Sequence, residues 1–166
     1  MIKIPDRIRF VFFDVDGVLS APQYYDEQLN EYVIGFSDET WNDYLDKEGV
    51  ATYQYCKPVK VLRDLMVQLK DEGINTYVLS TIANDTEAKA KISFLDEHYH
   101  DLFTDLYFVE HDRDKVTFIK EFAGRNNIEI GACLLVDDTY ALLLECRIAG
   151  ISCCHLSNIL ADNITR

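Results

Sequence analysis

The sequence predicts an α/β fold, in which an open parallel sheet is flanked by helices and a small lid is inserted after the first strand. Short apolar runs alternate with amphipathic helical patterns along the chain. The first apolar run, 8–13, is bounded by charged residues, as in a parallel strand buried on both faces. The 38 residues of 20–57 then separate it from the first helix, which is long for a connection in a compact domain.

The same patterns give the order of the elements. Strands are expected at 8–13, 74–79, 106–109, 132–136 and 151–156, and helices at 58–73, 84–99, 112–126 and 140–149. Pro58 suits the first position of a helix, and Gly73 suits the residue that ends it. Asn84, with Glu87 three residues later, predicts a capping box. Within 20–57 we expect a short helix at 37–49 and two short strands at 32–36 and 50–55.

Composition limits the class of protein. The chain has 166 residues, which is the size of one domain, so we expect a single domain over 1–166 with an insert at about 20–57. A net charge of −13 disfavours nucleic acid and anionic membrane surfaces as partners. No apolar stretch is long enough to cross a membrane, and the first ten residues have no signal core, so we expect a cytoplasmic protein. The five cysteines are odd in number and lack C-x-x-C spacing, which indicates small buried hydrophobes.

Chemistry-bearing residues follow three of the predicted strands. Asp14-Val15-Asp16-Gly17-Val18-Leu19 follows the first strand, Ser80-Thr81 the second and Asp137-Asp138 the fourth, while Lys115 lies near the start of the helix before the fourth strand. In open α/β sheets, ligands bind at the carboxyl ends of the strands. Each of these sites alone is better explained as a turn former or a helix cap. Together they are harder to dismiss, because four clustered carboxylates repel one another unless a cation is present, and Mg²⁺ fits best.

With a metal bound, these residue types suit phosphoryl transfer. One aspartate can attack phosphorus and form an aspartyl-phosphate. A second acid, two residues along the chain, can protonate the leaving oxygen and then activate water. A lysine and a hydroxyl can hold the phosphoryl oxygens as charge redistributes.

The four segments resemble, in the expected order, the four motifs of the haloacid dehalogenase-like (HAD-like) superfamily of phosphohydrolases. Asp14 to Leu19 resembles the first motif and Val78-Leu79-Ser80 the second, while Asp114-Lys115 resembles the third and Leu135-Val136-Asp137-Asp138 the fourth. The resemblance covers nearly the whole chain outside the insert. It implies a Rossmann-like fold and a magnesium-dependent phosphatase whose substrate is a small phosphomonoester.

The resemblance also implies a role for each matching residue. Asp14 would be the nucleophile and a metal ligand, and Asp16 the general acid and base, binding the metal through its backbone carbonyl. Ser80 and Thr81 would bind phosphate. Lys115 would neutralise Asp14 and the phosphoryl oxygens, with Lys89, Lys91 and Lys120 as rivals for that role. Asp138 would bind Mg²⁺ directly, and Asp137 through water.

Alternatives to a hydrolase remain at this stage. A true dehalogenase is disfavoured, because in this superfamily the second aspartate, Asp16, accompanies phosphoryl transfer. A phosphomutase would pass the phosphoryl group to another hydroxyl, but the small lid counts against it, since a mutase must exclude water. A non-catalytic binding protein that keeps the fold is expected to lack a motif residue, and none is missing.

The insert raises the question of the substrate. It holds 8 of the 20 aromatic residues, which could stack on a nucleobase but are better interpreted as the lid's own small core. The acidic residues of the insert favour a phosphomonoester that carries no charge outside its phosphate group. The run from Ser80 through Lys89, 94–98 and Phe108 to Lys115 has a weaker likeness to the 5′(3′)-deoxyribonucleotidase branch, which makes a nucleoside monophosphate the first substrate hypothesis and a sugar phosphate the second. A lid this small also leaves room for closure by a second subunit in a homo-oligomer.

Overall fold

The central sheet is parallel and has five strands. A computed structural model describes residues 2–34 and 37–161, apart from the side chain of Asp38. The strand order is β7-β6-β1-β8-β9, with β1 in the middle. The strands are β1 (Phe10–Phe13), β6 (Asn75–Thr81), β7 (Asp105–Val109), β8 (Cys133–Asp137) and β9 (Ser152–His155). All five expected strands are therefore present, and the predicted fold class is confirmed.

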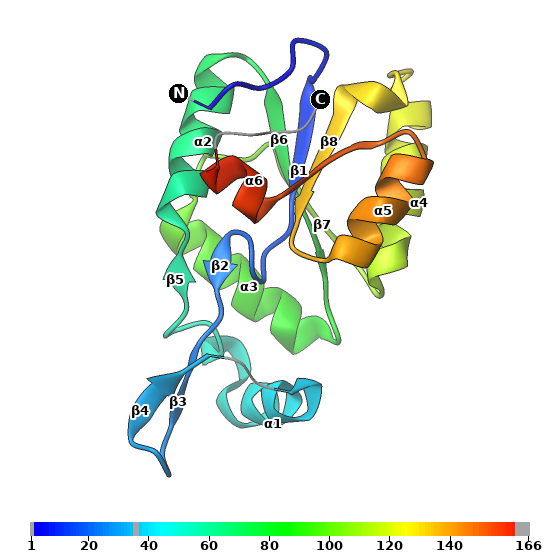
Figure 1. The fold of residues 1–166 in the computed structure, drawn as a ribbon. Coiled ribbons are helices and arrows are strands. Elements are labelled where there is room, and N and C mark those ends of the chain that lie inside the picture. The colour runs from blue at the N-terminus through cyan, green and yellow to red at the C-terminus, as the bar shows by residue number, and fades with distance from the viewer. Residues whose placement is uncertain (1, 35–36, 162–166) are drawn as a thin grey trace.

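Helices cover both faces of the sheet (Figure 1). One face carries α2 (Lys60–Asp71), α3 (Asp85–His98) and α6 (Leu156–Leu160), and the other carries α4 (Asp112–Arg125) and α5 (Tyr140–Ile148). Alternate residues of β1 point to the two layers, so Val11 and Phe13 enter one hydrophobic cluster and Phe12 the other. Burial on both faces explains why β1 has no polar residue.

The register of β1 brings the functional segments to one edge of the sheet. Phe13 lies opposite Val78 of β6 and Val136 of β8. The backbone N–H of Asp14 donates to the carbonyl of Val136 at 3.0 Å, which extends the pairing by one residue. Because parallel strands end at the same edge, Asp14, Ser80 and Asp137 are all carried to the switch point beside β1, where the connections pass from the β6 side of the sheet to β8.

The insert, residues 20–57, lies beyond this edge of the sheet, at the bottom of Figure 1. It contains β2 (Ser20–Ala21), a hairpin of β3 (Tyr24–Asp26) with β4 (Glu31–Val33), α1 (Asp38–Glu48), the short 3₁₀ helix η1 (Gly49–Ala51) and the first residue of β5 (Lys57–Pro58). The helix expected at 37–49 is confirmed, with Ser37 as its N-cap.

Two expectations for this region are wrong. No strand forms at 50–55, because the chain continues from η1 through successive turns to Cys56. Pro58 does not start α2, which begins at Lys60; it pairs instead with Ser20 across β2 and β5. A proline lacks a backbone donor and is tolerated at the edge of so short a ladder. Of the strand expected at 32–36, the part through Val33 is present, and Phe36 lies outside the described residues.

The aromatic side chains of the insert pack mainly on one another. Tyr24 lies against Tyr44 and Tyr25 against Tyr32, with ring centroids 5.2 and 5.3 Å apart. Trp41 meets the ring of Tyr53 edge-on at 5.6 Å. Tyr44 and Tyr53 are buried. The interpretation of these residues as the lid's own core is confirmed for Tyr24 and Tyr44. It is not confirmed for Trp41 and Tyr53, which join the main hydrophobic cluster of the sheet, or for Tyr32, which is 56% exposed.

The two ends of the insert are fastened together at the sheet. The antiparallel pair β2–β5 joins them, and the backbone N–H of Val59 donates to the carbonyl of Leu19 at 3.0 Å. The buried hydroxyl of Tyr99, just after α3, donates to the same carbonyl at 2.6 Å and accepts from the Val59 N–H at 3.0 Å. One side chain thus ties both strands at the base of the insert to the helical layer.

Replacing Tyr99 with phenylalanine removes this tie. We expect Tyr99→Phe to lower the free energy of unfolding by about 1 kcal/mol, because the Leu19 carbonyl loses one of its two donors and keeps only the Val59 N–H. Urea denaturation measures the change. Tyr140→Phe is the control, since Tyr140 is exposed and its ring contact with His155 survives the substitution. Equal stability of the two variants would contradict the assignment.

None of the helices in residues 2–34 and 37–161 is both long and apolar enough to cross a membrane.

Candidate active site

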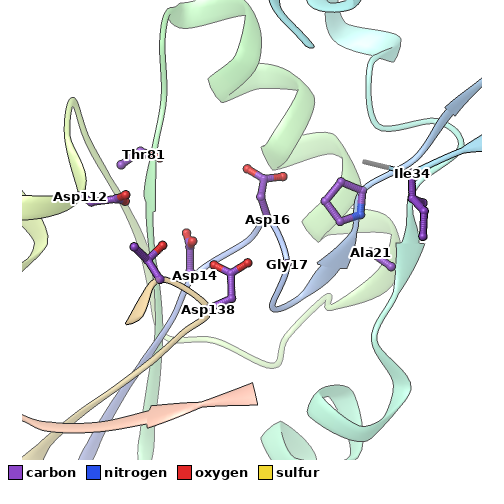
Figure 2. Close-up of a pocket in the computed structure, with 10 residues that line it drawn as sticks. Asp14, Asp16, Gly17, Ala21, Ile34, Thr81, Asp112 and Asp138 are labelled. Atoms are coloured by element: carbon purple, nitrogen blue, oxygen red, sulfur yellow. The ribbon is translucent and has the colours of Figure 1, made fainter. Parts of the chain in front are cut away.

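A cavity of about 520 Å³ opens at the carboxyl edge of the sheet, between the strand ends and the insert. It is lined by the aspartates Asp14, Asp16, Asp112 and Asp138, by Gly17, Thr81 and Thr139, and by the apolar residues Ala21, Pro22 and Ile34. Figure 2 shows the carboxylates on one side and Ala21 and Ile34 on the other. The cavity therefore has an acidic floor and an apolar wall.

Lys115 is buried beneath the aspartates. The residue lies in the first turn of α4, and its side chain has no exposed surface. Its Nζ is 3.1 Å from Asp14 Oδ2, 2.8 Å from Asp137 Oδ2 and 3.2 Å from Asp112 Oδ1. Burial alone would lower the pKa of Lys115, but the charges of Asp14 and Asp137 outweigh burial and raise it. Lys115 is thus a permanent cation at the position that the sequence indicated.

Asp14 is buried with only part of its charge compensated. Asp14 is 7% exposed, and its Oδ1 has no hydrogen-bond partner among the described residues. Burial raises the pKa of Asp14 to about 6, and the neighbouring Asp137 and Asp16 act in the same direction, against the opposing effect of Lys115. An oxygen left without a partner in the interior normally costs stability, so this one is available for a ligand.

The raised pKa of Asp14 makes a prediction about stability. The folded protein binds more protons than the unfolded chain between pH 3.8 and about 6. The contribution of Asp14 to stability is therefore fully present below pH 3.8 and lost as the pH rises through about 6. In metal-free protein we expect Asp14→Asn to gain stability relative to wild type from pH 4 to pH 7, as measured by urea unfolding. A relative loss across that range would contradict the shift.

Three carboxylates converge beside that oxygen. Asp14, Asp137 and Asp138 each offer an oxygen, and these atoms lie within 4.8 Å of one another. Asp137 is fully buried; its Oδ2 accepts from Lys115, and its Oδ1 accepts from the Thr139 N–H at 2.9 Å. Asp138 is more exposed, and burial together with the charge of Asp137 raises the pKa of its carboxyl. A hard divalent cation suits such a set of oxygens, so the residues present fit Mg²⁺.

Gly17 allows Asp138 to approach this cluster. Its φ of +72° is in the left-handed region, and a Cβ built on it would be 1.9 Å from Asp138 Oδ2. The Gly17 N–H also donates to the carbonyl of Ser20 at 3.0 Å, closing the turn that leads into the insert. Only glycine satisfies both the turn and the nearby carboxylate.

We expect Gly17→Ala to be destabilising and to displace Asp138. The strained φ costs about 1–2 kcal/mol, and the new methyl group forces the carboxylate away. Gly124→Ala is the matched control, because Gly124 lies in α4 with open space around it, where alanine favours the helix. Thermal unfolding of both variants, with and without Mg²⁺, measures the effect. A Gly17→Ala variant as stable as Gly124→Ala would contradict this account.

Asp16 has different neighbours from Asp14. Its carboxylate points away from Asp14 and Asp138, toward α3 (Figure 2). Lys91 Nζ of α3 is 2.8 Å from Asp16 Oδ2, and the hydroxyl of Tyr53 donates to Asp16 Oδ1 at 2.7 Å. Burial and the charge of Asp16 raise the pKa of Tyr53 well above its ordinary value, so the hydroxyl keeps its proton.

Ser80 and Thr81 differ in their access to the cavity. Ser80 is fully buried, and its Oγ accepts from Lys91 Nζ at 3.1 Å. Thr81 is half-buried and lines the cavity. The two hydroxyl residues expected to bind phosphate are therefore at the correct strand end, but Thr81 is the one that reaches the space.

Sequence reasoning underrated Lys91 and missed Tyr53. The motif resemblance makes Lys91 only a rival of Lys115, yet both lysines are buried at the site, Lys115 beside Asp14 and Lys91 beside Asp16. The predicted capping box forms only in part: Asn84 caps α3, but the Glu87 carboxylate accepts from the N–H of Ala83, one residue before the cap. A signal for Lys91 existed in the sequence, because the cap at Asn84 fixes the helix phase and puts Lys91 on the apolar face with Phe94 and Leu95. Nothing in the sequence indicated Tyr53, since its contact depends on how the insert folds back.

No protein-family model and no curated protein sequence matches the chain. Solved structures do. A haloacid dehalogenase-like family hydrolase from Streptococcus pneumoniae matches with a TM-score of 0.59 and 15% identity, over 94% of this chain and 91% of that one. A HAD-superfamily hydrolase of subfamily IA from Geobacter sulfurreducens matches with a TM-score of 0.57 and 14% identity, over 88% of each chain.

A third match is the N-terminal part of a Bacteroides fragilis protein that contains a phosphatase domain and was crystallised with Mg. Its TM-score is 0.58 at 16% identity, and the match covers 96% of this chain and 41% of that one. At sequence identities this low, the structural likeness establishes the fold alone. The chain has the HAD-like fold, as the motif resemblance implied. The weaker likeness to the deoxyribonucleotidase branch stays a prediction.

Proposed function

We propose that this chain is a magnesium-dependent phosphomonoester hydrolase that acts through an aspartyl-phosphate on Asp14. The observation that carries the proposal is the pairing of a partnerless, buried Asp14 oxygen with an adjacent buried lysine, at the floor of an open cavity. A purely structural aspartate would have both oxygens satisfied. The HAD-like fold and the bound Mg of the Bacteroides fragilis relative support the assignment.

Asp14 and Asp138 would hold the metal directly. Asp137 already accepts from Lys115 and from the Thr139 N–H, so we assign it a contact through water. The carboxylate of Asp16 faces Lys91 and Tyr53, which leaves its backbone carbonyl as the ligand that it would offer. When bound, Mg²⁺ would offset the charge of these carboxylates and of the substrate phosphate.

The residues themselves then divide the reaction into two steps. In the first, an oxygen of Asp14 bonds to phosphorus while the bond to the leaving oxygen breaks, and Asp16, as the general acid, gives a proton to that oxygen. In the second, Asp16 takes a proton from water, the water oxygen bonds to phosphorus, and the bond to Asp14 breaks. Inorganic phosphate leaves, and both aspartates return to their starting states.

Lys115 and Thr81 would bind the phosphoryl group. Lys115 is a fixed cation 3.1 Å from Asp14 Oδ2, so it can stabilise charge on the transferred oxygens without rearrangement. Thr81 lines the cavity and carries a hydroxyl that could bind the phosphoryl group. Ser80 would need to change its present contact with Lys91 to reach the phosphoryl group, so we assign it a supporting place beneath Thr81.

The cavity favours a small substrate with an uncharged body. Its wall opposite the aspartates is formed by Ala21, Pro22 and Ile34, and Ile34 is 75% exposed. The described aromatic rings of the insert contact one another, which weakens the case for base stacking. We therefore place simple neutral monoesters first, and we keep nucleoside monophosphates and sugar phosphates as the two groups to test beside them.

The deciding experiment is hydrolysis of p-nitrophenyl phosphate by the wild-type chain, with Mg²⁺ or with a chelator. We expect turnover that stops with the chelator and returns on adding Mg²⁺. A panel of neutral-bodied, nucleoside and sugar monophosphates then ranks the substrates. Turnover that continues in the presence of the chelator would overturn the metal assignment. No turnover of any ester, together with failure of beryllium fluoride and Mg²⁺ to raise the unfolding temperature, would overturn the proposed function.

A further inference from the structure

Two donors from outside the four motifs hold the Asp16 carboxylate, one on each oxygen. Lys91 Nζ lies 2.8 Å from Oδ2, and the Tyr53 hydroxyl lies 2.7 Å from Oδ1. Both donors are nearly inaccessible to solvent, at 1% exposure for Lys91 and 3% for Tyr53. The Asp16 side chain itself is 35% exposed and lines the cavity. A partly open carboxylate is thus oriented by two fixed groups.

We propose that Lys91 and Tyr53 are positioning residues that orient Asp16 for proton transfer to and from the substrate, so that the insert takes part in the chemistry as well as covering the site. This inference rests on the proposed function. A carboxylate with a donor on each oxygen cannot rotate freely about its side-chain bonds. Proton transfer depends steeply on such alignment, which is why positioning is worth preserving at this residue.

Lys91 is itself held rigidly. Its Nζ lies 3.2 Å from Glu87 Oε1, one turn earlier in α3, and donates to the Ser80 hydroxyl and to the Thr81 carbonyl. Burial alone would lower the pKa of Lys91, but the charges of Asp16 and Glu87 outweigh burial and raise it, so the side chain stays a cation. Lys91 therefore connects the end of β6 with Asp16 through one charged atom.

Tyr53 is held by the insert. Its ring meets Trp41 of α1 edge-on at 5.6 Å and lies 5.8 Å from the ring of Phe94 in α3. Its hydroxyl donates to Asp16, which lies in the loop after β1, and so links the insert to that loop. Any displacement of the insert from the sheet edge withdraws this donor, while Lys91 stays in place.

The test compares two esters of nearly the same shape. Phenyl phosphate needs its leaving oxygen protonated, whereas p-nitrophenolate leaves with little help. A variant with a poorly oriented Asp16 should therefore lose more activity on phenyl phosphate. For Tyr53→Phe we expect kcat/KM to fall about tenfold more for phenyl phosphate than for p-nitrophenyl phosphate. Phosphate binding is common to both esters. The ratio of the two decreases in kcat/KM therefore reports on proton transfer alone.

Tyr44→Phe is the matched control. Tyr44 is a second buried tyrosine of the insert, and its hydroxyl makes no hydrogen bond to Asp16 among the described residues. We expect this variant to keep the wild-type ratio. Asp16→Asn sets the upper limit of the selective loss, and Lys91→Met should lie between it and Tyr53→Phe. Unfolding temperatures of all variants are measured alongside, so that a loss of folding is seen directly.

Three results would overturn the inference. Tyr53→Phe could leave both rates unchanged, it could lower both by the same factor, or Tyr44→Phe could show the same selective loss. If the wild-type chain hydrolyses no ester, and beryllium fluoride with Mg²⁺ does not raise its unfolding temperature, the proposed function falls and this inference falls with it. An active wild type without the selective loss removes only the roles of Tyr53 and Lys91.

A second measurement requires no turnover. Trp41 is the only tryptophan of the chain, and it packs on Tyr53. In metal-free protein, Asp16→Ala removes the acceptor of the Tyr53 hydroxyl, so we expect a shift of the Trp41 fluorescence maximum. Asp138→Ala, which removes another carboxylate of the same cavity, should leave the maximum unchanged. An unchanged maximum in Asp16→Ala would overturn the link between the insert and Asp16.

Discussion

Asp14→Asn is expected to lower the hydrolysis of p-nitrophenyl phosphate by about 10³-fold or more, because an amide cannot form the acyl-phosphate that the proposed reaction requires. Brief reaction with radiolabelled substrate, followed by acid quench, should label wild type and leave the variant unlabelled. Because Asp14→Asn keeps the shape of the side chain and removes a buried charge, a loss of folding is not expected to explain the result. Labelled or active Asp14→Asn protein would exclude Asp14 as the nucleophile.

Lys115→Met should have the largest effect on stability. The substitution leaves Asp14, Asp112 and Asp137 around a site that has lost its cation. Removing one partner from a buried ionic cluster costs about 3–5 kcal/mol, since the remaining charges stay desolvated. Urea unfolding of metal-free protein at pH 7 measures the loss.

Lys120→Met provides the comparison for that result. Lys120 belongs to the same helix, but its side chain is exposed, so we expect a change of about 0.5 kcal/mol or less. Mg²⁺ should recover part of the stability lost in Lys115→Met, because it supplies positive charge to the same carboxylates. Similar stability of the two variants would mean that the carboxylates are not held by Lys115.

The sheet and its helices could be predicted because local patterns agree with the final packing. The apolar run before Asp14 is buried on both faces, and the cap at Asn84 accepts from Thr86 N and Glu87 N at the start of α3. Motif order then placed Asp14, Lys115 and Asp137 together, as the structure shows. In this part of the chain, each element is specified by its own residues and by its neighbours along the sequence.

The insert could not be predicted as well, because its contacts are non-local. The segment 50–55 carries two tyrosines that favour a strand, yet it turns back so that Tyr53 can reach Asp16, 37 positions earlier in the chain. Pro58 suited a helix start and was instead used in the β2–β5 pair. Both outcomes depend on which surface the insert packs against, and propensity carries no information about that.

The closed base of the insert has a consequence for how such a protein can diversify. Its two ends leave the sheet side by side, joined by β2–β5 and by Tyr99. The entropy of closing a loop between fixed ends changes only slowly with its length. Segments of other lengths and compositions can therefore be exchanged between Ala21 and Lys57, provided that each replaces the packing of Tyr53 and Cys56 in the main hydrophobic cluster. The reaction at Asp14 and the selection of the substrate by the insert can therefore change independently. A new segment would still have to supply a donor to Asp16 in place of the Tyr53 hydroxyl.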